Sequence, residues 1–288
     1  MDLSAELLTI NMAAYGTAAP KAPIDPPKLY ICALPKSGLH LATRFAVTLF
    51  SPWHSKRNWY GTNAWTNDEN IKNLEKAAII LGQVKRGEYT KGHLAYVSAI
   101  DWLFRLLGFG FMFVYRDLRD VAISQAYHIM ADNSSRLKFD PKDRSKYDGM
   151  SKEEVMLAAI KGDDVVDPLI ERWERYAGWL DCDWILTMRF EEMVLRSERA
   201  AGQFFDYIHK MALKDSNTTG AMTNKRTRNA IIKCIVAESK RTEGSPTFRK
   251  GKVGSWKHEF TPAVTAAFKE RDVNNWLVEL GYAKDKDW

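Results

Sequence analysis

Short apolar segments that alternate with helix-like segments constrain the fold of this chain most strongly. Residues 28–34 (KLYICAL) form an apolar run that Pro35 stops, a pattern that predicts a buried strand. Runs of the same character lie at residues 77–84, 110–115 and 183–190. Strands that alternate with helices favour a parallel sheet covered by helices on both faces. The predicted fold is therefore α/β, a single domain with a central, mainly parallel sheet flanked by helices.

Helical patterns occupy most of the intervening sequence. One of them begins after Ser151, where Glu154 three residues later completes a capping-box pattern. The other predicted helices span residues 37–50, 95–107, 117–130, 167–181, 197–213, 224–240 and 262–280. In a sheet built this way, ligands bind beyond the carboxyl ends of the strands.

The domain boundaries follow from composition. Residues 1–27 end in APKAPIDPPK, where prolines remove backbone donors and disfavour helix, so we expect an arm outside the core. Residues 28–288 then form the α/β domain. Residues 132–150 are polar and charged, and we interpret the region 132–166 as a lid or insert.

Charge and cysteine content narrow the class of partner. The net charge of +6 favours an anionic partner, which includes nucleic acid, anionic glycans and phosphorylated cofactors. Cys32, Cys182 and Cys234 lack metal-ligand spacing, so we expect reduced thiols and a cytoplasmic location. No histidine pair has HExxH-type spacing, so no metal site is predicted. Charges interrupt the most apolar stretch, residues 94–115, so no membrane span is predicted.

A first candidate phosphate site is PKSGLH at residues 35–40, directly after the first strand. The unpaired N–H groups of a helix start bind phosphate, Gly38 lets the backbone approach an anion, and Lys36 adds a full charge. This is a P-loop-like strand–loop–helix unit. The alternative is an ordinary turn with a solvated lysine. A Walker A loop is absent, which disfavours an ATP- or GTP-hydrolysing enzyme.

A second candidate is YRDLRDVAIS at residues 115–124. Helical side chains lean toward the N-terminus, so Ser124 is expected to reach the same anion as Arg116 at the strand end. The alternative is a plain helix start, in which Asp117 and Asp120 lie favourably near the positive end of the helix dipole.

The segment KGHL, residues 91–94, offers an acid–base pair. Lys91 and His93 alternate, so both side chains point to one side of an extended backbone. A nearby cation lowers the pKa of a histidine and keeps it neutral, as a general base must be. The alternative is an exposed loop histidine.

The basic, glycine-bearing segment RKGKVGSWK completes the set with Arg249, Lys250 and Gly251. Alone, it also fits a solvated charge run or a nucleic-acid contact. An aromatic cluster at residues 53–65 fits either an acceptor platform or packing under a loop. Taken in this order, the phosphate-binding segments predict a protein that binds a nucleotide with phosphates at both ends.

These motifs resemble those of the sulfotransferases that use 3′-phosphoadenosine-5′-phosphosulfate (PAPS), and most of all those of the cytosolic branch. PKSG resembles the loop for the 5′-phosphosulfate, and Arg116 with Ser124 resembles the 3′-phosphate motif. Lys91 and His93 match the Lys-x-His catalytic pair. Phe190 stands where an aromatic side chain packs near the adenine.

The resemblance implies two sets of site residues. The implied catalytic residues are Lys36, Lys91, His93 and Ser124. The implied residues that bind PAPS, or its product PAP (3′-phosphoadenosine-5′-phosphate), are Lys36, Ser37, Gly38, Leu39, His40, Leu41, Arg116, Ser124, Phe190, Arg249, Lys250 and Gly251. The family often has Thr-Thr-Trp after PKSG, so the leucines and histidine here remove an adenine-stacking face.

The activity implied is in-line transfer of a sulfuryl group from PAPS to a hydroxyl or amine, with His93 as general base and no metal. The acceptor is a small molecule, a lipid or a sugar, and nucleic acid is not an expected partner. The main alternative is a P-loop kinase of small molecules, which would need Mg²⁺. A non-enzymatic nucleic-acid-binding protein is a third possibility, supported by charge alone.

Overall fold

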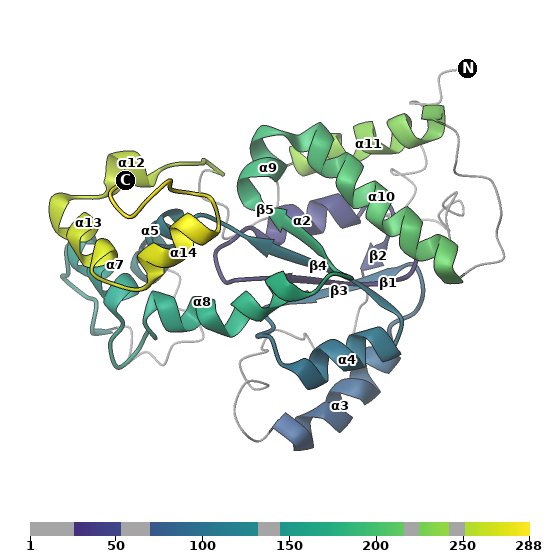
Figure 1. Ribbon diagram of the computed structural model, residues 1–288, viewed down its shortest axis with the longest axis horizontal. Helices are drawn as coiled ribbons and strands as arrows, with labels where there is room; N and C mark the ends of the chain where they lie inside the picture. Colours follow the sequence, from purple (N-terminus) through teal and green to yellow (C-terminus); the bar gives the residue numbers. More distant parts are fainter. Residues whose placement is uncertain (1–25, 53–69, 132–144, 216–224, 242–250) are drawn as a thin grey trace. The chain divides into compact units, whose positions relative to one another are not determined.

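The computed structural model describes residues 26–52, 70–131, 145–215, 225–241 and 251–288 (Figure 1). The chain forms two compact units. One comprises residues 1–33, 38–115 and 178–248 and contains every strand, so we call it the sheet unit. The other comprises residues 34–37, 116–177 and 249–288, and we call it the helical unit.

The sheet unit is built on a five-stranded parallel sheet with the order β2-β3-β1-β4-β5. The strands are β1 (Lys28–Ala33), β2 (Ser51–Pro52), β3 (Glu88–Gly92), β4 (Phe109–Tyr115) and β5 (Leu186–Arg189). This architecture confirms the predicted α/β class. Because β1 pairs with both β3 and β4, the carboxyl ends of these three strands lie side by side.

Helices cover both faces of this sheet, as the continuous burial along β1 requires. Leu29 and Ile31 belong to the core that α2 (Leu39–Ala46), α9 (Phe190–Leu195), α10 (Ser197–Asp215) and α11 (Lys225–Ser239) complete. Tyr30 points the other way, where it stacks on Phe111 and meets the tilted ring of Phe104 at 4.8 Å. Phe104 belongs to α4 (Ser98–Leu106), which lies with α3 (Asn70–Gly82) on that side (Figure 1).

The helical unit contains α5 (Leu118–Met130), α7 (Lys152–Lys161), α8 (Leu169–Ala177), α12 (Trp256–Glu259), α13 (Pro262–Lys269) and α14 (Val273–Glu279). The predicted capping box is present, because the Ser151 hydroxyl accepts from Glu154 N–H and the Glu154 carboxylate accepts from Ser151 N–H. Trp173 of α8 is fully buried and meets Trp276 of α14 edge to face at 5.5 Å. Apolar packing of this kind holds the unit together without strands.

The predicted strand at residues 77–84 is wrong. Residues 77–82 form the second half of α3, and the strand lies further on, at β3. Ala77 and Leu81, four residues apart, are buried while Ile79 between them is 59% exposed, which is helical spacing. The apolar pattern did not indicate β3, because this strand contains the charged residues Glu88 and Lys91, although Tyr89 between them is buried.

Several boundaries also differ from the prediction. Residues 37–50 do not form a helix from the start, because α2 begins at Leu39. The strand predicted at 183–190 is only β5, and Phe190 already begins α9. The helix predicted at 167–181 ends at Ala177 and continues as the 3₁₀ turn η2 (Gly178–Asp181). The helix predicted at 262–280 is divided into α13 and α14, and the short β2 was not predicted.

The cysteines of the described residues carry free thiols. Cys32 is fully buried in β1 as predicted, and burial raises the pKa of its thiol to about 12. Among the described helices, none has both the length and the apolar character needed to cross a membrane. Residues 1–25 of the predicted arm and residues 132–144 of the predicted lid lie outside the described residues, whereas the remainder of that lid contains α7.

Candidate functional site

Residues 35–37 are the part of the phosphate loop PKSGLH that belongs to the helical unit. They combine an unusual backbone conformation with an unsatisfied buried polar atom. Lys36 has a φ of +73°, in the left-handed region that few non-glycine residues occupy. Ser37 donates its N–H to the Leu34 carbonyl at 3.0 Å and is fully buried. Within the described part of the chain, the Ser37 hydroxyl oxygen has no hydrogen-bond partner. A buried hydroxyl without a partner is costly, so this loop is shaped for a further polar group.

The Lys36 ammonium lies in a cationic surrounding. Burial, and then the charge of Arg116, lower the pKa of Lys36 to about 8. His128 lies near the C-terminal end of α5, where burial, and then the charge of Lys36, lower the pKa of its imidazole to about 4. Positive charge is thus concentrated where an anion would relieve the repulsion.

The sheet unit supplies the rest of the loop. Gly38 caps α2 with a φ of +104°, a conformation that favours glycine. A Cβ at this position would lie 2.5 Å from the ring of Phe190, so the absence of a side chain allows the aromatic ring to reach the loop. Leu39 and Leu41 pack against the hydrophobic core, whereas His40 is exposed. The two leucines therefore serve packing through their side chains.

Arg116 joins the three predicted segments within the helical unit. One end of its guanidinium donates to the Lys36 carbonyl at 3.5 Å, and the other end donates to the Lys252 carbonyl at 2.8 Å. The side chain is 9% exposed and pairs with Asp120 at 3.2 Å. Three segments therefore meet at Arg116, as the motif order predicted. They are PKSGLH at residues 35–40 (the phosphate loop), the start of α5, and the glycine-bearing segment RKGKVGSWK (the late loop).

Asp120 holds the late loop in place. Its carboxylate is fully buried and accepts from the backbone N–H groups of Gly254 (2.8 Å) and Trp256 (3.1 Å) as well as from Arg116. The sequence suggested only a favourable dipole position for this residue. Its role as the anchor of the loop was missed, because the partners lie more than 130 residues away in the chain.

His93 has a defined tautomer. Its Nδ1 lies 2.7 Å from the Ala33 carbonyl at the end of β1. A carbonyl only accepts, so Nδ1 carries the proton and Nε2 is left with a lone pair. The next residue is anchored too, because the Leu94 carbonyl accepts from Trp179 Nε1 at 2.8 Å and from the Cys32 thiol at 3.3 Å.

Lys91 is the last residue but one of β3 and is partly buried. Burial, and then the charge of Arg44, lower the pKa of its ammonium. His93 follows the last residue of β3, so Lys91 and His93 lie on either side of the point where this strand ends.

Ser124 lies two turns into α5 and is partly buried. His128 follows one turn later, and sequence reasoning gave it no role. The spacing of four from Ser124 was the signal that could have found it. Arg249 and Lys250 lie outside the described residues, as does the aromatic cluster at residues 53–65, whereas Gly251 is described with a φ of +56°.

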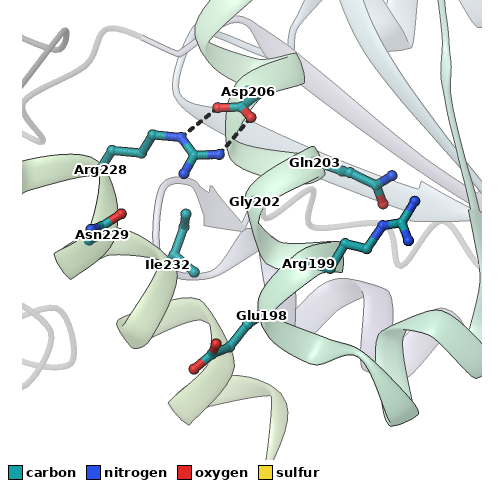
Figure 2. Close-up of a pocket in the computed structure, with 8 residues that line it drawn as sticks. All are labelled: Glu198, Arg199, Gly202, Gln203, Asp206, Arg228, Asn229 and Ile232. Carbon is teal, nitrogen blue, oxygen red and sulfur yellow. Dashed lines mark hydrogen bonds and ion pairs between the residues drawn. The ribbon is translucent and has the colours of Figure 1, made fainter. Parts of the chain in front are cut away.

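A groove of about 450 Å³ lies between α10 and α11 (Figure 2). The Arg228 guanidinium of α11 donates hydrogen bonds of 2.8 and 2.6 Å to the Asp206 carboxylate of α10. Ile232 also lines the groove. None of the predicted site residues lines it. In the described ranges, no three His, Cys, Asp or Glu side chains gather closely enough to hold a metal ion.

The described fold has known counterparts. A mouse sulfotransferase, SULT7A1, crystallised with PAP, superimposes with a TM-score of 0.54 at 16% identity over 94% of this chain and 93% of its own. Two structures of retinol dehydratase with PAP, one with androsterone and one with retinol, have TM-scores of 0.45 and 0.44, each at 16% identity over 96% of this chain and 94% and 95% of their own. A search of curated proteins found no significant match.

The family comparison is more decisive than these distant structures. The sequence model of the sulfotransferase domain family matches residues 26–272 of this chain. This range includes every described strand and all of the motif segments. The chain therefore belongs to the sulfotransferase domain family.

Proposed function

We propose that this protein transfers a sulfuryl group from PAPS to a hydroxyl or amine of a small-molecule, lipid or sugar acceptor. The single observation that carries the proposal is the meeting of the phosphate loop, the start of α5 and the late loop at Arg116. Family membership supplies the reaction class. PAPS would supply the activated sulfuryl group and, through its 3′-phosphate, a second anionic handle.

The phosphate loop fits an anionic ligand on three counts. The Ser37 hydroxyl, which has no partner among the described residues, the left-handed Lys36 and Gly38, and the depressed pKa of Lys36 all suit an anion in contact with this segment. We assign Lys36 the task of stabilising negative charge that builds on the leaving phosphate oxygen.

We assign the 3′-phosphate to Arg116 and Ser124, with Arg249, Lys250 and Gly251 as further ligands implied by the family motif. Asp120 keeps Arg116 oriented by a hydrogen bond of 3.2 Å and fixes the loop that follows Gly251. Phe190, whose ring reaches Gly38, is the residue proposed to pack near the adenine. The pairing of two phosphate sites would hold the donor in line for transfer.

We assign the general base to His93. Nδ1 is committed to the Ala33 carbonyl, so Nε2 is the atom that takes the acceptor proton. The same hydrogen bond stabilises the imidazolium that forms, because the carbonyl dipole faces the new charge. Lys91 would assist at the sulfuryl oxygens.

The first test is ligand choice. PAP should raise the melting temperature of the protein more than AMP or ATP with Mg²⁺ does at equal concentration, because a ligand that binds only the folded state stabilises it in proportion to its affinity. Stabilisation by ATP with Mg²⁺ but not by PAP would support the kinase alternative and sink the proposal.

The second test addresses the base. His93→Gln should lower sulfuryl transfer from radiolabelled PAPS to a panel of phenols, alcohols and amines by about 10²–10⁴-fold, the usual contribution of a general base. PAP affinity, measured by calorimetry, should stay unchanged. His258→Gln, which changes an exposed histidine of α12, is the matched control. Wild-type turnover in His93→Gln would remove the assignment.

A further inference from the structure

Arg119 lies in an aromatic corner that Trp256 and Trp288 form in the helical unit. Its guanidinium carbon is 3.7 Å from the centroid of the Trp256 ring and 4.4 Å from that of Trp288. The two rings meet nearly at right angles, at 82°, with centroids 5.0 Å apart. We call these three residues the tryptophan corner.

The cation in this corner is fixed from its other sides. Arg119 is 2% exposed and forms a bidentate pair with Asp117, with a shortest distance of 2.7 Å. It also donates to the Tyr282 carbonyl at 3.1 Å. Attraction between a cation and an aromatic face strengthens as water is removed, and here Arg119 is buried while Trp256 and Trp288 are partly buried.

The corner is linked to Arg116 through Trp256. The backbone N–H of Trp256 donates to the Asp120 carboxylate, which also accepts from the backbone N–H of Gly254 and from Arg116. A shift of the Trp256 backbone therefore disturbs the carboxylate that orients Arg116.

Trp288 is itself held in place by directed contacts. Its indole Nε1 donates to the Asn274 side-chain oxygen at 2.6 Å, and the Asn274 amide donates to the Lys286 carbonyl at 3.1 Å. Asn274 is 3% exposed, so this polar link is buried. The ring of Phe268 closes the remaining side at 5.8 Å.

We propose that Trp288 is a positioning residue for the 3′-phosphate part of the donor site. It holds Arg119 and Trp256 so that the late loop and Asp120 present Arg116 in one orientation. This inference rests on the proposed function, because it assumes that Arg116 contacts the 3′-phosphate.

The test compares two ligands that differ only in that phosphate. Affinities for PAP and AMP are measured by calorimetry in the wild-type protein and in Trp288→Leu and Trp288→Phe. Leucine keeps apolar volume but removes the aromatic face, whereas phenylalanine keeps it. Trp102→Ala is the matched control, since Trp102 is a 62% exposed tryptophan of α4 in the sheet unit.

We expect Trp288→Leu to lower the ratio of PAP to AMP affinity by up to about tenfold, because the energy of the lost cation–π contact is the most that can be withdrawn from the orientation of Arg116 that favours the 3′-phosphate. Trp288→Phe should restore most of it, and Trp102→Ala should not change it. An unchanged ratio in Trp288→Leu, even with a lower melting temperature, would show a purely structural role and overturn the inference. Equal affinities for PAP and AMP in the wild-type protein would instead overturn the 3′-phosphate assignment on which the inference rests.

Discussion

The lowered pKa of Lys36 predicts that PAP binding weakens as pH rises. In the ligand-free protein this pKa is about 8 instead of 10.5, so burial beside Arg116 disfavours the charged form by at most about 3 kcal/mol, less where solvent screens the partly exposed side chain. A bound phosphate or sulfonate is an opposite charge, which raises the pKa again. The complex therefore holds the proton more tightly than the free protein does.

The sign and size of the effect follow from this difference. Binding is strongest below the free pKa, where Lys36 is already an ammonium, and weakens as pH rises through about 8. In the free protein, about nine-tenths of the Lys36 side chains are charged at about pH 7 and about one-tenth at about pH 9. The PAP dissociation constant should therefore rise about tenfold over that interval. The phosphates of PAP are already ionised there and contribute little to the slope.

Isothermal titration calorimetry between pH 7 and 9 measures this dependence, and buffers of different ionisation enthalpy report the proton taken up. Lys36→Arg is the control, because a guanidinium stays charged across the interval. A flat profile in the wild-type protein would refute the reasoning. The same slope in Lys36→Arg would also refute it, since the proton would then belong to another group such as Lys91.

Two further predictions test the scaffold. Gly38→Ala should lower the melting temperature and weaken PAP binding, because its φ of +104° and the Phe190 ring 2.5 Å from the added Cβ leave no room for a methyl group; wild-type stability and affinity would contradict this. Tyr207→Phe should destabilise the fold by about 1–3 kcal/mol in urea unfolding, because the Tyr207 hydroxyl accepts from the Phe111 N–H of β4 at 2.8 Å. A change below about 0.3 kcal/mol would show that another acceptor replaces it.

Local patterns predicted much of this fold. The strand at β1, the strand at β4 and the helix α5 were expected because each shows its own apolar run or cap signal. The strand β3 was missed because its burial comes from its neighbours in the sheet and not from its own composition. The apolar run at residues 77–84 was misplaced because apolar content alone does not distinguish a buried strand from one face of a helix.

The site was predictable where a motif is continuous in sequence. Lys36 and Arg116 each follow a strand, β1 and β4, that pair with one another, so their contact within the helical unit was expected from the motifs. The contacts of Asp120 and Trp288 were not predictable from the sequence, because only the tertiary fold brings their partners near. The roles assigned to the site residues remain predictions that the mutants above test.

The pairing of Arg116 with Asp120 bears on the turnover of the enzyme. Under the proposed assignment of Arg116 to the 3′-phosphate, an incoming phosphate would gain less from this guanidinium than from an isolated cation, because the Asp120 carboxylate already neutralises it. The attraction that captures the donor is weakened, and so is the attraction that retains the spent nucleotide. An internal competitor of this kind favours rapid exchange of product for fresh donor, so that cycling depends less on slow dissociation.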